Sequence, residues 1–221
     1  YRVHALEFVT SPKGIDLTTK EIVDLLGFSS IPTYKNVKIG AIDSGAYKHS
    51  TMRMIDTADA RVPPLLKFFG NLAGAIDRSG HGTNIAAEIA GKYKAYDGFE
   101  FQGALPGVKF KMIKSLYSIM GFGRASDVIA GIDMLEGYDV INMSLGADID
   151  YSKYRQDEDP IALAIDRTVR NAIDNDREPP IIVCAAGNSG PLGRTINSPA
   201  ASEHTISVGS YSYRYRAVSW F

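Results

Sequence analysis

The sequence has 221 residues, of which 45% are hydrophobic, enough to bury a sizeable core in one large or two small domains. Its 24 lysine and arginine residues balance 25 aspartate and glutamate residues, which argues against nucleic acid or an anionic membrane as a partner. No apolar run reaches about 18 residues, so no membrane-spanning helix is expected, and the single cysteine excludes an internal disulfide.

The first elements are a predicted helix and a predicted buried strand. Residues 16–26 carry apolar side chains at near-helical spacing and are followed by the stop signal Gly27. The apolar, β-branched run 37–42 predicts a strand that ends at Asp43. Small and apolar residues over 83–90 then predict a helix that opens just after His81.

A strand, a helix and a second strand are predicted next. Residues 108–116 alternate as a strand does. Ser126 and Asp127 are expected to cap a helix that Gly137 ends. The apolar run 140–143 predicts the second strand.

The last third begins with an acidic stretch, residues 148–159, which we interpret as a loop. Pro160 favours the first turn of a helix, predicted over 161–173. The expected apolar face of this helix comprises Ile161, Leu163, Ala164, Ile165 and Val169.

The apolar runs 181–186 and 205–208 predict two further strands. Strands that alternate with helices, several of them apolar on both faces, indicate an α/β fold: a parallel β-sheet with helices on both faces. No internal repeat or linker divides the chain. We therefore expect one domain over residues 33–221, with residues 1–32 as an N-terminal extension packed on its core.

Candidate functional residues fall at the carboxyl ends of predicted strands, where ligands bind in such sheets. Asp43 ends one strand, Ser144-Leu145-Gly146 follows another, and Gly187-Asn188 follows a third. Amide hydrolysis needs a nucleophile, a base, a carboxylate that holds the base, and donors for the oxyanion. The sequence offers the last three in Asp43, His81 and Asn188.

Each of these motifs also fits an ordinary structural role when taken alone. Asp43 suits a turn or a helix cap, His81 a loop, and Asn188 a left-handed turn after a strand. Gly121-Phe122-Gly123 and Ser144-Leu145-Gly146 are edges where an extended peptide would add as a strand, or plain turns.

As an ordered set, the motifs resemble the catalytic domain of subtilisin-like serine proteases, the subtilase family. The matching segments run from about Val37 to Phe221. They are Asn36-Val37-Lys38-Ile39, Asp43-Ser44-Gly45, Gly80-His81-Gly82-Thr83, Gly103-Ala104-Leu105-Pro106-Gly107, Asp139-Val140-Ile141-Asn142-Met143-Ser144-Leu145-Gly146, Ala185-Ala186-Gly187-Asn188, Ser198-Pro199-Ala200 and Val208-Gly209.

The resemblance implies endopeptidase chemistry on a polypeptide substrate, with no cofactor required. Asp43 and His81 resemble the acid and base of the triad, and Asn188 resembles the oxyanion-hole donor. Two segments resemble the edges that hold the substrate backbone in the family: Gly121-Phe122-Gly123 and Ser144-Leu145-Gly146. A third segment, Ala185-Ala186-Gly187, resembles a wall of the primary specificity pocket.

The family's nucleophile segment, Gly-Thr-Ser-Met-Ala, does not occur in the sequence. We therefore expect an incomplete peptidase domain whose serine lies on a complementary C-terminal fragment or a separate chain.

Other features bear on the same resemblance. Asn84 replaces a histidine common in the family, which is tolerable outside the triad. The family also implies a propeptide and, by analogy only, secretion. The alternative is a pseudoprotease or peptide-binding regulatory module, against which the joint presence of acid, base and oxyanion donor argues.

No metal site is predicted. The acidic residues of the 148–159 loop lack EF-hand spacing, which favours a solvated loop. His4, His49 and His204 have no partners at zinc-ligand spacing. The loop 92–102 has no clear version of the calcium loop of some family members, so structural calcium is not supported by a motif. No phosphate-binding glycine motif follows a strand.

Overall fold

The computed structural model describes residues 2–5, 19–25, 27, 36–52, 55–62, 75–92, 94–96, 99–148, 158–193, 195–212 and 215–220. A six-stranded sheet forms their centre, in the order β11-β10-β8-β2-β6-β3, and every neighbouring pair is parallel. Its strands are β2 (Lys38–Asp43), β3 (Ile55–Asp59), β6 (Lys109–Lys114), β8 (Val140–Met143), β10 (Ile181–Ala185) and β11 (Thr205–Val208). The predicted α/β fold with a parallel sheet is confirmed.

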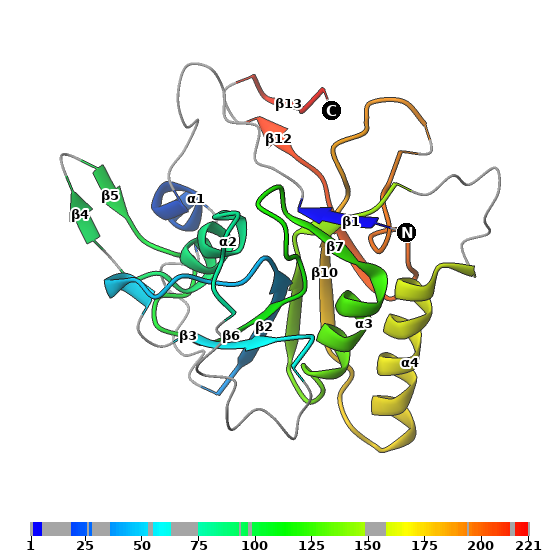
Figure 1. Cartoon of the computed structure of the whole chain (residues 1–221). Coiled ribbons are helices and arrows are strands. Elements are labelled where there is room, and N and C mark those ends of the chain that lie inside the picture. Colours follow the sequence, from blue (N-terminus) through cyan, green and yellow to red (C-terminus); the bar gives the residue numbers. More distant parts are fainter. Residues whose placement is uncertain are drawn as a thin grey trace.

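Helices cover both faces of this sheet (Figure 1). Helix α2 (His81–Ala90) lies on one face, whereas α3 (Ala125–Asp133) and α4 (Pro160–Asp174) lie on the other. The alternation of side chains along β2 sends Ala41 into the core under α2 and Ile42 into the core under α3. Both faces of the strand are therefore apolar, as the sequence run 37–42 requires.

The remaining strands that the structure describes form small sheets separate from the central one. The strands β7 (Phe122–Arg124), β1 (Arg2–Ala5) and β9 (Leu145–Gly146) form a three-stranded sheet in that order. The antiparallel pairs are β4 (Lys94–Tyr96) with β5 (Phe99–Phe101) and β12 (Tyr211–Ser212) with β13 (Ala217–Val218). The short helices are α1 (Thr19–Leu25) and a 3-10 turn over Ser50–Met52. The 92–102 stretch, expected as a loop, thus contains a hairpin.

The first turns of two helices differ from the sequence prediction. Helix α2 begins at His81 itself rather than after it. Helix α3 begins at Ala125 behind Arg124, so Ser126 and Asp127 belong to its first turn and do not cap it. The carboxylate of Asp127 instead forms an ion pair with Arg61, with 2.8 Å between Oδ2 and the Arg61 Nη2 atom. Helix α3 also ends at Asp133, before Gly137.

Helix α4 follows the prediction at its start but not on its whole surface. Pro160 is its first residue, and the Asp159 carboxylate accepts a hydrogen bond from the Ile161 backbone N–H at 2.9 Å. Ile161, Ala164, Ile165 and Val169 are buried, as expected. Leu163 is 49% exposed, because its position lies off the stripe that faces the sheet. Residues 149–157 of the predicted acidic loop lie outside the described residues.

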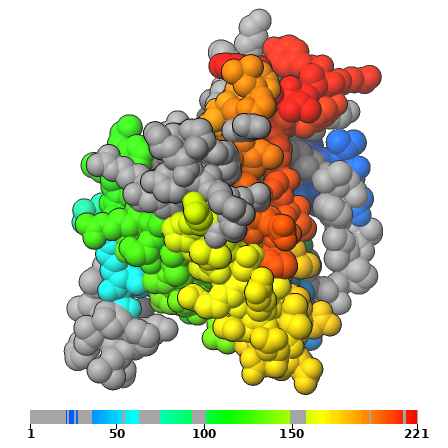
Figure 2. Space-filling view, turned by 90° about the vertical axis from the view of Figure 1, so that its right-hand side faces the viewer, coloured from blue at the N-terminus to red at the C-terminus, as the bar shows by residue number. Residues whose placement is uncertain are grey.

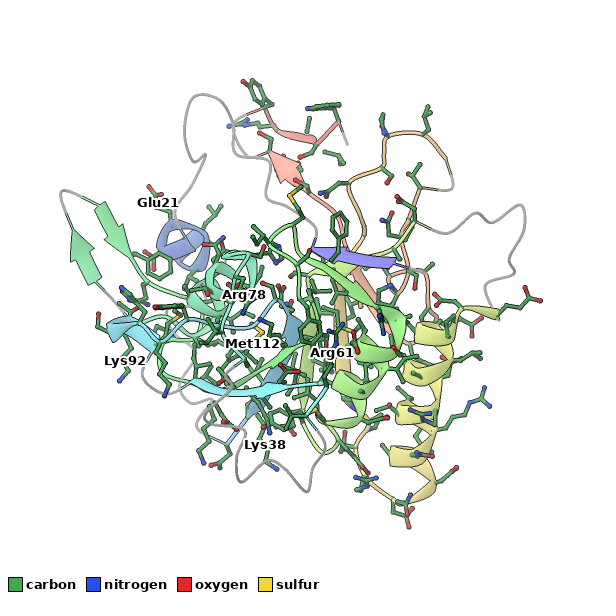
Figure 3. All side chains as sticks on the ribbon, viewed as in Figure 1. Glu21, Lys38, Arg61, Arg78, Lys92 and Met112 are labelled. Carbon is green, nitrogen blue, oxygen red and sulfur yellow. The ribbon has the colours of Figure 1, made fainter. Side chains whose placement is uncertain are left out.

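Two further views place these parts in space. Figure 2 shows α4 (yellow) on the surface of the molecule that faces the viewer. Residues nearer the C-terminus (orange and red) lie beside and above it. Figure 3 shows Lys38, the first residue of β2, toward the lower end of the sheet and Arg78, just before α2, toward the upper end. The carboxyl ends of the parallel strands, and the site built on them, therefore lie at the upper end. In the described part of the chain, no helix is long and apolar enough to cross a membrane.

Candidate active site

Asp43 and His81, predicted from separate motifs, lie within hydrogen-bonding distance of each other. His81 Nδ1 is 2.8 Å from Asp43 Oδ1 and 3.0 Å from Oδ2. The Asp43 side chain is fully buried, and the His81 side chain is 8% exposed. A carboxylate only accepts hydrogen bonds, so Nδ1 carries the proton and Nε2 is the nitrogen left with a lone pair. This arrangement gives an imidazole base oriented by a buried carboxylate.

The backbone around Asp43 explains why its side chain is fixed. Asp43 is the last residue of β2, and its carbonyl oxygen accepts hydrogen bonds from the N–H groups of Ser115 and Leu116. The Ser44 N–H donates to Asp43 Oδ1 at 2.6 Å. The residues that follow β6 therefore hold the main chain of Asp43, and the turn at Ser44 holds its carboxylate.

Two glycines let the segment of Asp43 and the helix of His81 approach closely. A Cβ atom at Gly82 would lie 2.2 Å from the Gly45 carbonyl oxygen and 3.1 Å from Asp43 Oδ1. Gly45 has φ +103°, and a Cβ there would lie 2.3 Å from the Ala75 carbonyl oxygen. A side chain at Gly82 would force α2 away from the turn after β2, and one at Gly45 would force away the segment of Ala75, which precedes α2.

A buried carboxylate that the sequence analysis missed, Asp77, lies beside this pair. Asp77 accepts hydrogen bonds from Ser44 Oγ at 2.8 Å and from Thr83 Oγ1 at 2.6 Å. Burial raises the pKa of Asp77, but hydrogen bonds from Thr83, Gly80 and Ser44 outweigh burial and hold its pKa below the usual value. The sequence signal was an aspartate just ahead of a helix start, which becomes visible once the helix is known to begin at His81.

The two expected peptide-binding edges lie on either side of the N-terminal strand β1. Figure 1 shows β1 beside one of them, β7. β1 is antiparallel to both β7 and β9, with His4 opposite Phe122 on one side and Gly146 on the other. Gly121 and Ser144 lie just before these strands, and Leu145 pairs with Ala5. A Cβ at Gly123 would lie 2.3 Å from the Ser115 carbonyl oxygen, so β7 lies directly against the end of β6. The chain's own backbone thus occupies the space between the edges.

The third group of predicted site residues follows β10. Ala185 ends this strand. The Ala186 N–H donates to the Val208 carbonyl, and the Ala186 carbonyl accepts a hydrogen bond from the Asn197 N–H. Gly187 has φ +117°, and a Cβ there would lie 2.5 Å from Asn197 Oδ1. Asn188 follows this turn and is exposed. Because β10, β8 and β2 are neighbours, their carboxyl ends bring Asn188, Ser144 and Asp43 to one edge of the sheet.

Among the residues that the structure describes, no three histidine, cysteine or acidic side chains are grouped so that they would hold a metal ion.

Comparisons with known proteins match the chain to one family of peptidases. The model of the subtilase family, peptidase S8, matches residues 34–221. Subtilisin DY of Bacillus licheniformis is 32% identical over 91% of the chain and 64% of its own length. The serine protease AprX of Bacillus subtilis is 29% identical over 80% of the chain and 39% of its own length. The chain therefore spans less than two thirds of either relative.

Solved structures show the same fold. The nisin leader peptidase NisP from Lactococcus lactis superimposes with a TM-score of 0.64 at 19% identity, over 90% of the chain and 63% of that structure. The prenylagaramide maturation protease PagA gives a TM-score of 0.62 at 17% identity, over 90% of the chain and 61% of that structure.

Proposed function

Because the chain belongs to the subtilase family of serine peptidases, we propose that it supplies the acid, the base and an oxyanion donor of a serine endopeptidase. The observation that carries the proposal is the buried Asp43 carboxylate 2.8 Å from His81 Nδ1. This contact leaves Nε2 as a base whose conjugate acid is stabilised by a fixed negative charge. The remaining component is a serine hydroxyl.

The proposed reaction proceeds through an acyl-enzyme. The serine oxygen attacks the carbonyl carbon of the peptide bond while His81 Nε2 takes the hydroxyl proton, and Asp43 stabilises the imidazolium. The Asn188 amide donates a hydrogen bond to the tetrahedral oxyanion. His81 then gives its proton to the departing amine. Water, deprotonated by His81, hydrolyses the acyl-enzyme, releasing the new carboxyl terminus and restoring the serine.

The serine is proposed to lie on a segment that these 221 residues do not include. The family's Gly-Thr-Ser-Met-Ala stretch does not occur in the sequence, and the chain matches 64% of the length of Subtilisin DY. Such a segment would be a continuation of the same protein or a complementary fragment. Adding it to the 221-residue chain should restore reaction with a serine-directed probe.

An extended polypeptide is the proposed substrate. β7 and β9 already accept a strand between them, since β1 pairs with both by its main chain. Main-chain pairing binds a peptide without regard to most of its side chains, as an endopeptidase requires. The walls of the primary pocket are proposed to be Ala185, Ala186 and Gly187.

Replacing Asn188 with alanine tests the oxyanion role in the complete protein. We expect kcat for a peptide substrate to fall by about 10² to 10³ with little change in KM, because the lost donor acts only in the transition state. Replacing the exposed Glu203 with glutamine is the control and should leave both constants unchanged. An increase in KM with an unchanged kcat would assign Asn188 to substrate binding instead.

A further inference from the structure

Asp77 makes more hydrogen bonds than an ordinary turn residue, and all of its partners surround the Asp43–His81 pair. Its Oδ1 accepts from Ser44 Oγ at 2.8 Å and from the N–H groups of Ser79 and Gly80, each at 2.9 Å. Its Oδ2 accepts from the Thr83 N–H at 2.9 Å and from Thr83 Oγ1 at 2.6 Å. The residue is 8% exposed, so these contacts are made largely away from water.

These contacts join the two segments that carry the proposed acid and base. Ser44 follows Asp43 directly, and its Oγ accepts a hydrogen bond from the Gly82 N–H at 2.9 Å while donating to Asp77. Gly82 follows His81 directly. Hydrogen bonds therefore join Asp77 to Ser44, and Ser44 to Gly82. They link the residue after Asp43 to the residue after His81.

Asp77 also replaces the missing cap of α2. The N-cap residue, Gly80, has no side chain to accept from the first N–H groups of the helix. The Asp77 carboxylate accepts two of these hydrogen bonds, from Gly80 and Thr83, and places a negative charge at the positive end of the helix dipole. His81 is the first residue of this helix, so the carboxylate restrains the turn on which the base is carried.

The segment that carries Asp77 is itself fixed from the opposite side. The buried Lys114 ammonium donates to the Ile76 carbonyl, and the Ala46 N–H donates to the Ala75 carbonyl at 3.1 Å. Lys114 is opposite Asp43 in the parallel pairing of β2 and β6. Asp77 is thus tied to the same strand ends that position Asp43.

We propose that Asp77 is a positioning residue that holds His81 Nδ1 against Asp43 by clamping the first turn of α2 to the turn at Ser44. The inference rests on the proposed function only for its effect on turnover. Its structural content, the dependence of the His81–Asp43 contact on Asp77, stands without any peptidase activity. A base displaced by about 1 Å loses about 10²-fold in rate, so the clamp matters for catalysis.

The test is proton NMR on the full-length protein carrying Asp77→Asn. A short hydrogen bond to a carboxylate moves the His81 Nδ1 proton far downfield, and the signal is assigned by its absence in His81→Ala. The asparagine has the shape of the aspartate but offers Thr83 an N–H₂ group in place of an acceptor. We expect the downfield signal to broaden or disappear while the circular dichroism remains that of the folded protein.

The matched control is Asp159→Asn, which alters a helix cap of the same kind on α4, away from the pair. It should lower stability modestly and leave the His81 signal in place. In the full-length enzyme, Asp77→Asn should lower kcat by about 10- to 100-fold with KM changed less than about twofold.

A downfield signal of unchanged position and width in folded Asp77→Asn would overturn the proposal, whatever the activity. If that variant does not fold, Ser44→Ala takes its place, because it removes the bridge to Gly82 but leaves the helix cap. We expect the same signal to broaden in Ser44→Ala. An unaltered signal there would show that the clamp does not position His81.

Discussion

At the scale of single residues, the pair of Asp43 and His81 depends on groups that carry no chemistry. Gly82 leaves room for α2 to approach the turn after β2, and Gly45 leaves room for the segment of Ala75. The sequence singled out Asp43 and His81 as candidates because acid and base residues are few and these two lie in ordered motifs, and the structure places them in contact. Asp77 was not predicted, because a lone aspartate before a helix has many ordinary uses, and its bond to Ser44 is formed only in the folded chain.

Gly82→Ala tests this close approach. Its Cβ would lie 2.2 Å from the Gly45 carbonyl oxygen, so the backbone must shift, and we expect a loss of about 1–3 kcal/mol in the free energy of unfolding. Chemical denaturation measures the change. Gly209→Ala is the control, since a Cβ there meets no atom within 4 Å. Equal stability of the two variants would mean that the segments tolerate a wider separation.

At the scale of elements, the hydrophobic pattern predicted five of the six strands of the parallel sheet but missed β3 (Ile55–Asp59). The five predicted strands lie within two residues of their predicted bounds. β3 was missed because its sequence, Ile-Asp-Thr-Ala-Asp, has no continuous apolar run. The start of α3 was not predicted, since Asp127, which looks like a cap in the sequence, binds Arg61 across the fold. Such a competition between a local and a distant partner cannot be read from the sequence.

Helix α4 offers a matched comparison of two apolar residues on one element. Leu163 is 49% exposed, whereas Ile165 is fully buried. We expect Ile165→Ala to lower the free energy of unfolding by about 2–5 kcal/mol, because it leaves a cavity in the core. Leu163→Ala should change it by less than about 0.5 kcal/mol. Denaturant titrations of both variants measure the two changes. Equal losses in the free energy of unfolding would contradict this packing of α4.

Under the proposed function, the strand β1 occupies the space between β7 and β9 that a peptide substrate would enter. Proline at both Val3 and His4 removes two main-chain donors that point to opposite neighbours, and should release β1. We then expect KM for a peptide substrate of the complete enzyme to fall about tenfold, because free sites become more populated. Kinetics of the double-alanine variant, which keeps both N–H groups, provide the comparison. An unchanged KM in the proline variant would show that β1 and the substrate do not exclude each other.

At the scale of the whole molecule, the parallel sheet places three separate motifs at one edge. β2, β8 and β10 are neighbours in the sheet although many residues separate them along the chain, so their carboxyl ends carry Asp43, Ser144 and Asn188 together. The alternation of strands and helices predicted this class of fold. The insertion of β1 between β7 and β9 was beyond prediction, because short extended segments pair according to the space that the folded chain leaves.

Under the proposed function, His81, oriented by Asp43, activates a serine of this protein. The most direct test is the rate at which a fluorophosphonate labels the complete protein, compared with its His81→Ala variant. We expect one serine to be labelled in the wild type and the labelling rate to fall by about 10³-fold or more in the variant. A folded wild-type protein that is not labelled, or a variant labelled at the wild-type rate, would contradict the claim.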